Sequence, residues 1–309
     1  MTISSMNYFI VLARERNFTK AAQQLHITQQ SLSSHISALE QELGCQLLIR
    51  RMPLQLTYAG TVFLRYAENF QQELDNLQRE FCDITENQKG VLKIGIAYTR
   101  GRAIMPRLIA RFQEQYPNIE IHMSEAANKT LHNHLLHGEV DLAIANFPSS
   151  LQGVELQDFY PEEVVLLISS TLLDKLYPTG QEEVEACIAA GDLSVLQNCP
   201  FILDNPGDIA GGIERKVLEA AGIKPNVKAM ANSSETLLSL CVEGVGACFC
   251  PENLVSTALS AEQAAGLKVF HLGEVAKYPI RFGFLKTTYQ WNMMSEFMRI
   301  ASELYAPES

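Results

Sequence analysis

The sequence predicts a multidomain α/β protein, with a helical domain at the N-terminus, a long connecting helix and a C-terminal α/β region. Three observations support this fold class. Short amphipathic helices follow one another over residues 5–44, apolar residues repeat in heptads over residues 67–84, and strands alternate with helices from residue 91 onward. A chain of 309 residues is also too long for one ordinary hydrophobic core, so two or three domains are expected.

The composition is typical of a soluble globular protein, with 47% hydrophobic and 19% charged residues. No apolar run approaches the ~20 residues of a membrane helix, and the N-terminus lacks the basic region and cleavage site of a signal peptide. We therefore expect a cytoplasmic protein with no membrane partner. The formal net charge is −11, yet residues 1–66 contain six basic and three acidic side chains, so this segment can still bind a polyanion.

The first three helices are expected close together. Residues 5–15 carry one apolar stripe, and Thr19 is expected to cap a second helix that buries Ala21 and Ala22. After a tight turn, Thr28 caps a third helix, which Gly44 ends. Its buried face consists of Leu32, Ile36, Leu39 and Leu43.

Two short helices joined by a tight turn form a helix-turn-helix, whose second helix enters the major groove of DNA. The face of the third helix that is left exposed is polar and uncharged, and it consists of Gln29, Gln30, Ser33, Ser34 and His35. Gln and Ser side chains can pair with base edges, whereas cationic groups serve the phosphates.

Residues 47–57 predict a short strand pair, a wing, with Arg50 and Arg51 at its start as phosphate contacts. Thr57 caps the next helix, whose first amides could also meet a phosphate. The full set of candidate DNA contacts is Thr19, Lys20, Thr28, Gln29, Gln30, Ser33, Ser34, His35, Arg50, Arg51 and Thr57.

A long helix is expected from residue 58 to about 87. Its apolar residues are spaced 3, 4, 3, 4 and 3 apart, which is the seam of a coiled coil, and they are Ala67, Phe70, Leu74, Leu77, Phe81 and Ile84. The alternative is an amphipathic helix that packs on its own domain. Polar residues around most of the remaining surface favour a self-paired dimer helix.

The rest of the chain alternates strands with helices. Strands at 91–98, 119–125 and 140–146 enclose helices at 103–116 and 129–137, a βαβαβ run typical of an open sheet. A second α/β set extends from a strand at 163–169 to about residue 267. The last elements expected are strands near 267–272 and 279–285 and a helix at 291–305.

The N-terminal segment has a pattern of fixed spacings, which is Phe18-Thr19-x-Ala21-Ala22-x-x-Leu25, Thr28-Gln29, Ser33, Ile36, Leu39-Glu40, Leu43-Gly44, Leu47-Leu48-x-Arg50 and Leu56-Thr57-x-Ala59-Gly60. This pattern resembles that of the LysR-type transcriptional regulators. Many fixed spacings over about 60 residues make a specific signal. The sequence departs from the family at Gln30, where proline is common, and at Leu48-Ile49, where an aromatic residue is usual.

The resemblance implies a regulator of transcription without a cofactor or enzymatic activity. It implies a winged helix-turn-helix at 1–58, a dimerising linker helix at 59–89 and an effector domain of the periplasmic-binding-protein type at 90–309. Subdomain I of that domain would be residues 91–161 with 268–309, and subdomain II residues 162–267. The expected partners are promoter double-stranded DNA, a small-molecule effector, RNA polymerase and other copies of the chain, in a homodimer or homotetramer.

In an open α/β sheet, ligands bind beyond the carboxyl ends of the strands. The candidate effector contacts there are Tyr98, Thr99, Arg100, Arg102, Asn128, Asn146, Phe147, Asp204 and Asn205. Thr99 with Asn128 could hold a carboxylate, while the two arginines either add charge-assisted bonds or form a solvated rim. Asp204 and Asp208 are expected as helix caps. If Asp204 instead faces the cleft, the effector carries an amine or hydroxyl groups, and a zwitterion suits both sides.

Other classes are weighed against this interpretation. No nucleophile elbow, P-loop, GxGxxG or HExxH motif supports an enzyme. His132, His134 and His137 have poor three-ligand geometry on a helix, so a solvated helix is favoured over a metal site. Seven cysteines without a CxxC motif predict buried reduced thiols, although Cys248 and Cys250 share one strand face. A thiol-redox or metal sensor on the same scaffold is the alternative function.

Overall fold

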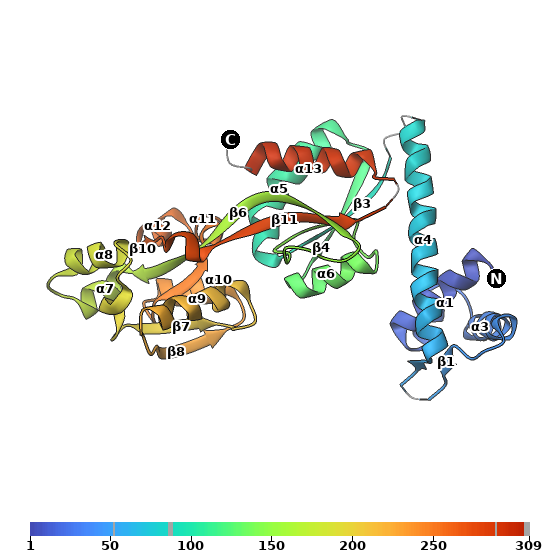
Figure 1. Ribbon diagram of the computed structural model, residues 1–309, viewed down its shortest axis with the longest axis horizontal. Helices are drawn as coiled ribbons and strands as arrows, with labels where there is room; N and C mark the ends of the chain where they lie inside the picture. The colour runs from blue at the N-terminus through green and yellow to red at the C-terminus, as the bar shows by residue number, and fades with distance from the viewer. Residues whose placement is uncertain (52, 86–88, 288, 306–309) are drawn as a thin grey trace.

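The computed structural model describes residues 1–51, 53–85, 89–287 and 289–305. It has an N-terminal domain, a long helix α4, and a C-terminal region in which two lobes are joined by long strands (Figure 1). Among the described residues, no helix is long and apolar enough to span a membrane.

The N-terminal domain is a three-helix unit with a two-stranded wing, as expected. Its helices are α1 (Ile3–Glu15), α2 (Phe18–Gln24) and α3 (Gln29–Leu43), and its antiparallel strands are β1 (Leu48–Ile49) and β2 (Gln55–Leu56). Phe9, Leu12, Leu32, Ile36 and Leu47 form the centre of its core, with the small Ala21 and Ala22. Because alanines occupy those two positions, α2 can approach its neighbours closely.

The cap of α2 differs from the prediction. The side chain of Asn17, not that of Thr19, accepts hydrogen bonds from the first amides of the helix, those of Thr19 (2.9 Å) and Lys20 (3.1 Å). The Thr19 hydroxyl donates instead to Oε1 of Gln29 at 3.0 Å. Asn17 precedes the helix in an extended conformation, from which a short amide side chain reaches the amides two and three residues later. Thr28 caps α3 and Gly44 ends it in a left-handed conformation, as expected.

Helix α4 (Tyr58–Ile84) begins against the wing. Thr57 caps it by accepting from the Gly60 amide, and its hydroxyl donates to the Gln46 carbonyl. A Cβ atom on Gly60 would lie 2.0 Å from the carbonyl oxygen of Leu47, so only glycine permits this approach. The predicted end of the helix falls at residues 86–88, which lie outside the described residues.

Subdomain I is built on a mixed sheet. It contains β3 (Gly90–Ile96), β4 (Ile119–Glu125) and β5 (Leu142–Ala145), which are parallel, with α5 (Tyr98–Gln115), α6 (Asn128–Leu136) and the C-terminal α13 (Asn292–Tyr305). Strand β11 (Lys277–Leu285), on which the chain comes back from subdomain II, pairs antiparallel with β5 and so belongs to this sheet. The βαβαβ run predicted from the sequence is therefore present.

Subdomain II contains a sheet on the far half of β6 (Val154–Ser169) and a separate parallel pair, β7 (Pro200–Asp204) with β8 (Asn226–Ala231). Strands β9 (Cys248–Pro251) and β10 (Leu267–Phe270) both pair antiparallel with β6. Its helices are α7 (Ser170–Leu176), α8 (Gln181–Ala189), η1 (Leu193–Leu196), α9 (Ile209–Ala220), α10 (Ser234–Val242), α11 (Glu252–Ala258), α12 (Ala261–Ala265) and η2 (Gly273–Ala276).

Two strands, β6 and β11, run between the lobes and pair with each other, from Val154↔Leu285 to Glu163↔Lys277 (Figure 1). This corrects two expectations. The predicted strand at 163–169 is only the second half of one 16-residue strand. Residues 268–270 belong to subdomain II, because β10 pairs with Leu166–Ser169, so the chain returns to subdomain I later than residue 268.

The close approach at Gly60 generates a prediction. Gly60→Ala should destabilise the N-terminal domain by about 1–3 kcal/mol, since the added methyl meets a fixed backbone oxygen. Hydrogen–deuterium exchange of α1 and α3 measures this domain separately from the lobes. The control is Gly212→Ala on α9, where a Cβ has open space and should be neutral or stabilising. Unchanged exchange in Gly60→Ala would show that the contact yields without cost.

Candidate nucleic-acid interface and ligand cleft

The polar face predicted on α3 is exposed in the structure. Leu32, Ile36 and Leu39 are buried behind it, whereas the prediction is wrong for Leu43, which is exposed at the end of the helix. Gln29, Gln30, Ser34 and His35 are exposed, and Ser33 is half-buried. His35 packs edge-on against Tyr8 at 5.0 Å between ring centroids, which orients one end of the face.

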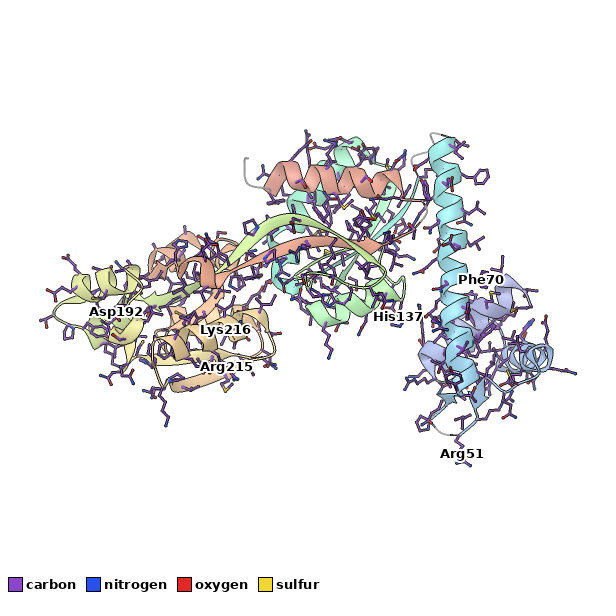
Figure 2. The ribbon with its side chains drawn as sticks, in the orientation of Figure 1. Arg51, Phe70, His137, Asp192, Arg215 and Lys216 are labelled. Carbon is purple, nitrogen blue, oxygen red and sulfur yellow. The ribbon has the colours of Figure 1, made fainter. Side chains whose placement is uncertain are left out.

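The two arginines of the wing have different surroundings. Arg50 pairs with Glu40 at 3.0 Å and donates to Ser37, while Glu40 also accepts from the Leu47 and Leu48 amides. Arg50 therefore ties the wing to α3. Arg51 lies at the exposed end of the hairpin (Figure 2). Among the described residues, neither Arg51 nor Lys20 forms an ion pair within the chain, so both cations are available to a phosphate.

A cleft of about 620 Å³ lies between the two lobes. The first residues of α5, α6, α9 and α10 all border it, from Ala97, Ala127, Asp208 and Ser233. The first three of these helices have no side-chain hydrogen bond at the N-cap. Their first amides thus point positive partial charge toward this space, which favours an anionic group.

The structure brings together most of the predicted effector contacts. Tyr98, Thr99, Arg100, Arg102, Asn128 and Asp204 line the cleft. Three predicted residues do not line it. Asn146 donates its amide to the Pro279 carbonyl, and Asn205 accepts from the Gly207 amide. Phe147 is buried because its ring fills the space that a side chain at position 283 would occupy, and Gly283 has none. The same ring stacks on His132.

Arg100 is not a rim residue. Its guanidinium is buried and meets Glu162 with three contacts of 3.0–3.1 Å. Glu162 also accepts from Tyr160 (2.9 Å), Tyr278 (2.5 Å) and Asn253 (2.9 Å). Burial, followed by the charge of Glu162, raises the pKa of both tyrosines, so they remain donors at neutral pH. The pair is electrically neutral as a unit and joins α5, β6, β11 and α11.

A second ion pair crosses the cleft at its edge. Arg102 of α5 contacts Glu235 of α10 at 3.1 Å, and both side chains are about half exposed. Since this pair and Arg100–Glu162 are each neutral, the remaining charged side chains of the lining are the acidic Glu125, Asp204 and Asp208. The cleft therefore combines positive helix ends with uncompensated carboxylates.

Asp204, a predicted effector contact, forms a buried acidic pair with Glu214, which was not predicted. Asp204 is not a helix cap. It ends β7, lines the cleft and accepts from the Asn205 amide at 2.6 Å, and its own amide donates to Glu214 at 3.3 Å. Glu214 is fully buried. The available signal was its position on the apolar face of α9, where it aligns with Val217 and Leu218. Asp208 begins α9, but its side chain makes no capping bond.

Four cysteines of subdomain II are buried, as predicted, and they are Cys199, Cys241, Cys248 and Cys250. The prediction is wrong for Cys45, which is exposed, and for Cys82 and Cys187, which are half-buried. Cys248 and Cys250 lie on β9 beside Cys241 in one apolar cluster. A hydrogen bond to Cys241 and burial raise the pKa of Cys248, and burial raises the pKa of Cys250. Burial likewise raises the pKa of Cys199 to about 12. Protonated, enclosed thiols react slowly with oxidants, so this cluster gives the thiol-sensor alternative little support.

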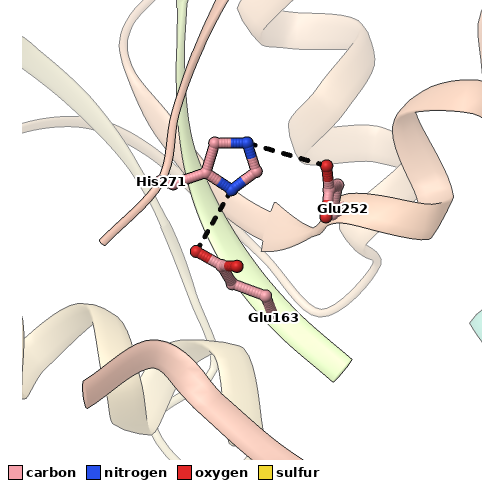
Figure 3. Close-up of side chains that lie close together, drawn as sticks. All are labelled: Glu163, Glu252 and His271. Atoms are coloured by element: carbon pink, nitrogen blue, oxygen red, sulfur yellow. Dashed lines mark ion pairs between the residues drawn. The ribbon is translucent and has the colours of Figure 1, made fainter. Parts of the chain in front are cut away.

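A histidine-containing cluster that was not predicted lies outside the cleft. His271 sits between two carboxylates, with Nδ1 at 3.2 Å from Glu163 and Nε2 at 3.8 Å from Glu252 (Figure 3). The carboxylates face opposite ring nitrogens, whereas a metal ion uses only one, so this geometry suits ion pairing. His132, His134 and His137 each have separate partners, which agrees with a structural role.

The acidic pair generates a prediction of pH dependence. Burial raises the pKa of Glu214 from its ordinary 4.5 to about 7, so the folded state keeps a proton that the unfolded chain loses. Stability therefore falls as pH rises from about 4.5 to about 7. Glu214→Gln should match the wild type near pH 4.5 and exceed it above pH 7 by on the order of 3 kcal/mol.

Urea unfolding at acidic and alkaline pH measures this difference. Glu219→Gln, an exposed position on the same helix, is the matched control and should follow the wild type. A stability difference for Glu214→Gln that does not change with pH would contradict the assignment.

Comparison with known proteins agrees with this architecture. Residues 3–61 match the model of bacterial regulatory helix-turn-helix proteins of the LysR family, and residues 85–305 match the LysR substrate binding domain. An uncharacterized HTH-type transcriptional regulator of Bacillus subtilis, YcgK, is 31% identical over 98% of this chain and 94% of its own. A probable RuBisCO transcriptional regulator of Thalassiosira pseudonana is 29% identical over 84% and 83%.

Solved structures share the fold over the whole chain. Full-length OxyR from Pseudomonas aeruginosa superposes with a TM-score of 0.71 at 23% identity, covering 98% of this chain and 95% of that one. CbnR in complex with its target DNA gives a TM-score of 0.64 at 20% identity, covering 98% and 99%. With both family models matched in order along the sequence, this chain belongs to the LysR family of transcriptional regulators, with a DNA-binding helix-turn-helix domain and an effector-binding domain.

Proposed function

We propose that this regulator reads promoter DNA with α3, holds the phosphates with Lys20 and Arg51, and acts as a self-paired oligomer. A small molecule in the interlobe cleft changes that binding. The observation that carries the proposal is the exposed, uncharged polar face of α3 in the same small domain as an exposed wing arginine, Arg51. This arrangement separates base reading from phosphate binding within one small domain.

Each predicted DNA contact has a role in this proposal. Gln29, Gln30, Ser33 and Ser34 read base edges, and His35 lies at the end of that face. Lys20 and Arg51 contact phosphates. Arg50 acts through Glu40 by positioning the wing, rather than by meeting the DNA as an unpaired cation. Thr28 and Thr57 hold the helix ends, and Thr19 orients Gln29.

Self-pairing rests on the apolar stripe of α4. Phe70, Phe81 and Ile84 are 56%, 58% and 68% exposed, and Leu77 is 49% exposed. In the N-terminal half of α4 the stripe continues into a groove of about 290 Å³ that includes Ile3 and Met6 of α1. A second copy of α4 would cover this surface in the way that a heptad seam requires. Four chains and a contact with RNA polymerase would extend the assembly as the family resemblance implies.

The cleft is suited to bind a carboxylate on its subdomain I side. Oδ1 of Asn128 already accepts from Arg100 (3.4 Å) and from the Asn146 amide (3.2 Å), so its NH₂ group is left as a donor. The Thr99 hydroxyl and the first amides of α5 and α6 add further donors.

We infer binding without turnover. Among the described residues that line the cleft there is no His, Lys or Cys, and the carboxylates and hydroxyls present are also the groups that hydrogen-bond a ligand. The cytoplasm, where the promoter DNA is, is the compartment that this function requires.

Removal of a base-reading side chain tests the DNA interface. Gln29→Ala should lose about 1–3 kcal/mol of binding free energy on a DNA site selected from a random duplex library, while its binding to random DNA persists. Arg51→Ala should weaken binding to the selected site and to random DNA alike, and should reduce the slope of log K against log salt concentration by about 1. Fluorescence anisotropy at several salt concentrations measures these effects, with the exposed Gln41→Ala as control. Equal losses for Gln29→Ala on both duplexes would remove α3 from base reading.

A charge placed in the stripe tests self-pairing. Leu77→Asp should convert the oligomer to smaller species, because it buries a carboxylate in the apolar seam. Analytical ultracentrifugation measures the mass in solution. Gln78→Asp adds the same charge at the neighbouring exposed position and should leave the mass unchanged. If Leu77→Asp keeps the wild-type mass, α4 does not form the interface.

A further inference from the structure

We propose that the effector carries a protonated amine, which binds the Asp204 carboxylate on the subdomain II side of the cleft and replaces a proton held by the Asp204–Glu214 pair. This inference rests on the proposed function, because it assigns the chemistry of the ligand in the same cleft. It makes the effector class a zwitterion, with its carboxylate toward Thr99 and Asn128 and its amine toward Asp204.

The first support is the position of Asp204. It stands at the carboxyl end of β7, is 2% exposed, and is one of the cleft-lining residues. Its Oδ1 is fixed by the Asn205 amide at 2.6 Å. An enclosed and oriented carboxylate on a residue of the cleft lining supplies both direction and charge to a donor.

The second support is the unsatisfied carboxyl group behind it. Glu214 is 0% exposed, and its Oε2 accepts the Asp204 amide at 3.3 Å. Among the described residues, its Oε1 has no hydrogen-bond partner. An ionised carboxylate that is buried without a partner costs free energy, so the Asp204–Glu214 pair keeps a proton when no ligand is bound.

The third support is the absence of a compensating cation among the described residues. Neither Asp204 nor Glu214 forms an ion pair there. The charged or titratable groups around Glu214 are Asp204 on β7, Cys248 on β9 and Arg215, which is exposed on its own helix. Asp208 adds a further negative charge near Asp204. An incoming ammonium group supplies the missing positive charge.

The binding step follows from this charge balance. The empty pair shares one proton between two carboxyl groups, and the ligand arrives as R–NH₃⁺. The ammonium donates hydrogen bonds to Asp204, the shared proton leaves to solvent, and the pair becomes doubly ionised beside a cation. No covalent bond forms in the ligand. The cleft volume of about 620 Å³ falls in the range of small-molecule sites.

Matched probes test the amine directly. The full chain is screened by thermal shift at neutral pH with the twenty L-amino acids, the corresponding 2-hydroxy acids and the corresponding decarboxylated amines. At least one amino acid should raise Tm, while its 2-hydroxy acid at the same concentration should raise it far less. Asp204→Asn should weaken the binding of that amino acid, with a Kd raised by about 10- to 100-fold. Asp174→Asn, an exposed position in the same lobe, should not.

Proton release is the second readout. Calorimetry of the same amino acid at about pH 6, in phosphate and in Bis-Tris, should show release of close to one proton on binding to the wild type, because this pH lies below the raised pKa of Glu214. Glu214 is a positioning residue behind Asp204. The Glu214→Gln variant should therefore still bind the amino acid but release almost no proton. This pattern would not arise if Glu214 served only to hold the fold.

Three results would overturn the inference. They are equal shifts from a 2-hydroxy acid and its amino acid, no shift from any amine-bearing probe at millimolar concentration, and unchanged proton release in Glu214→Gln. A carboxylate that binds without an amine would leave the proposed function intact. Failure of the proposed function would appear separately, as loss of the difference between selected and random DNA in wild-type protein.

Discussion

The cleft depends on the buried ion pair between Arg100 and Glu162. Arg100 belongs to the first turn of α5, which borders the ligand space, and Glu162 lies on β6 where that strand leaves subdomain I. Tyr278 contributes from β11 and Asn253 from subdomain II. Because both charges are removed from water, neither can be deleted without leaving the other uncompensated. The pair therefore fixes where the helix ends of one lobe stand relative to the other.

This constraint changes the interpretation of charge in the cleft. An arginine at the start of a helix beside a ligand site suggests an anion contact from sequence. In the structure its charge is already used, and the same holds for Arg102 with Glu235. The groups left to recognise an anion in the proposed site are the backbone amides with Thr99 and Asn128. The groups left to recognise a cation are the buried carboxylate of Asp204 and the exposed carboxylates of Glu125 and Asp208.

Much of the fold follows from local sequence signals. The helix caps at Thr28 and Thr57, the long helix α4 and the βαβαβ run all depend on neighbouring residues, and the structure contains them. The strand crossing did not follow. One continuous β6 and the placement of β10 depend on pairing between segments about a hundred residues apart. The same limit applies to the site, since Glu162 and Glu214 gain their importance from partners on other elements, and the burial of Phe147 depends on Gly283.

The paired crossing of β6 and β11 has a mechanical consequence. An antiparallel ladder resists stretching and sliding, because either motion breaks its hydrogen bonds, whereas bending out of its plane preserves them. The register shift between Ile280 and Arg281 interrupts the ladder inside the crossing and marks where bending is easiest. Relative motion of the two lobes is therefore expected as a bend at this shift, rather than as a sliding of one strand past the other.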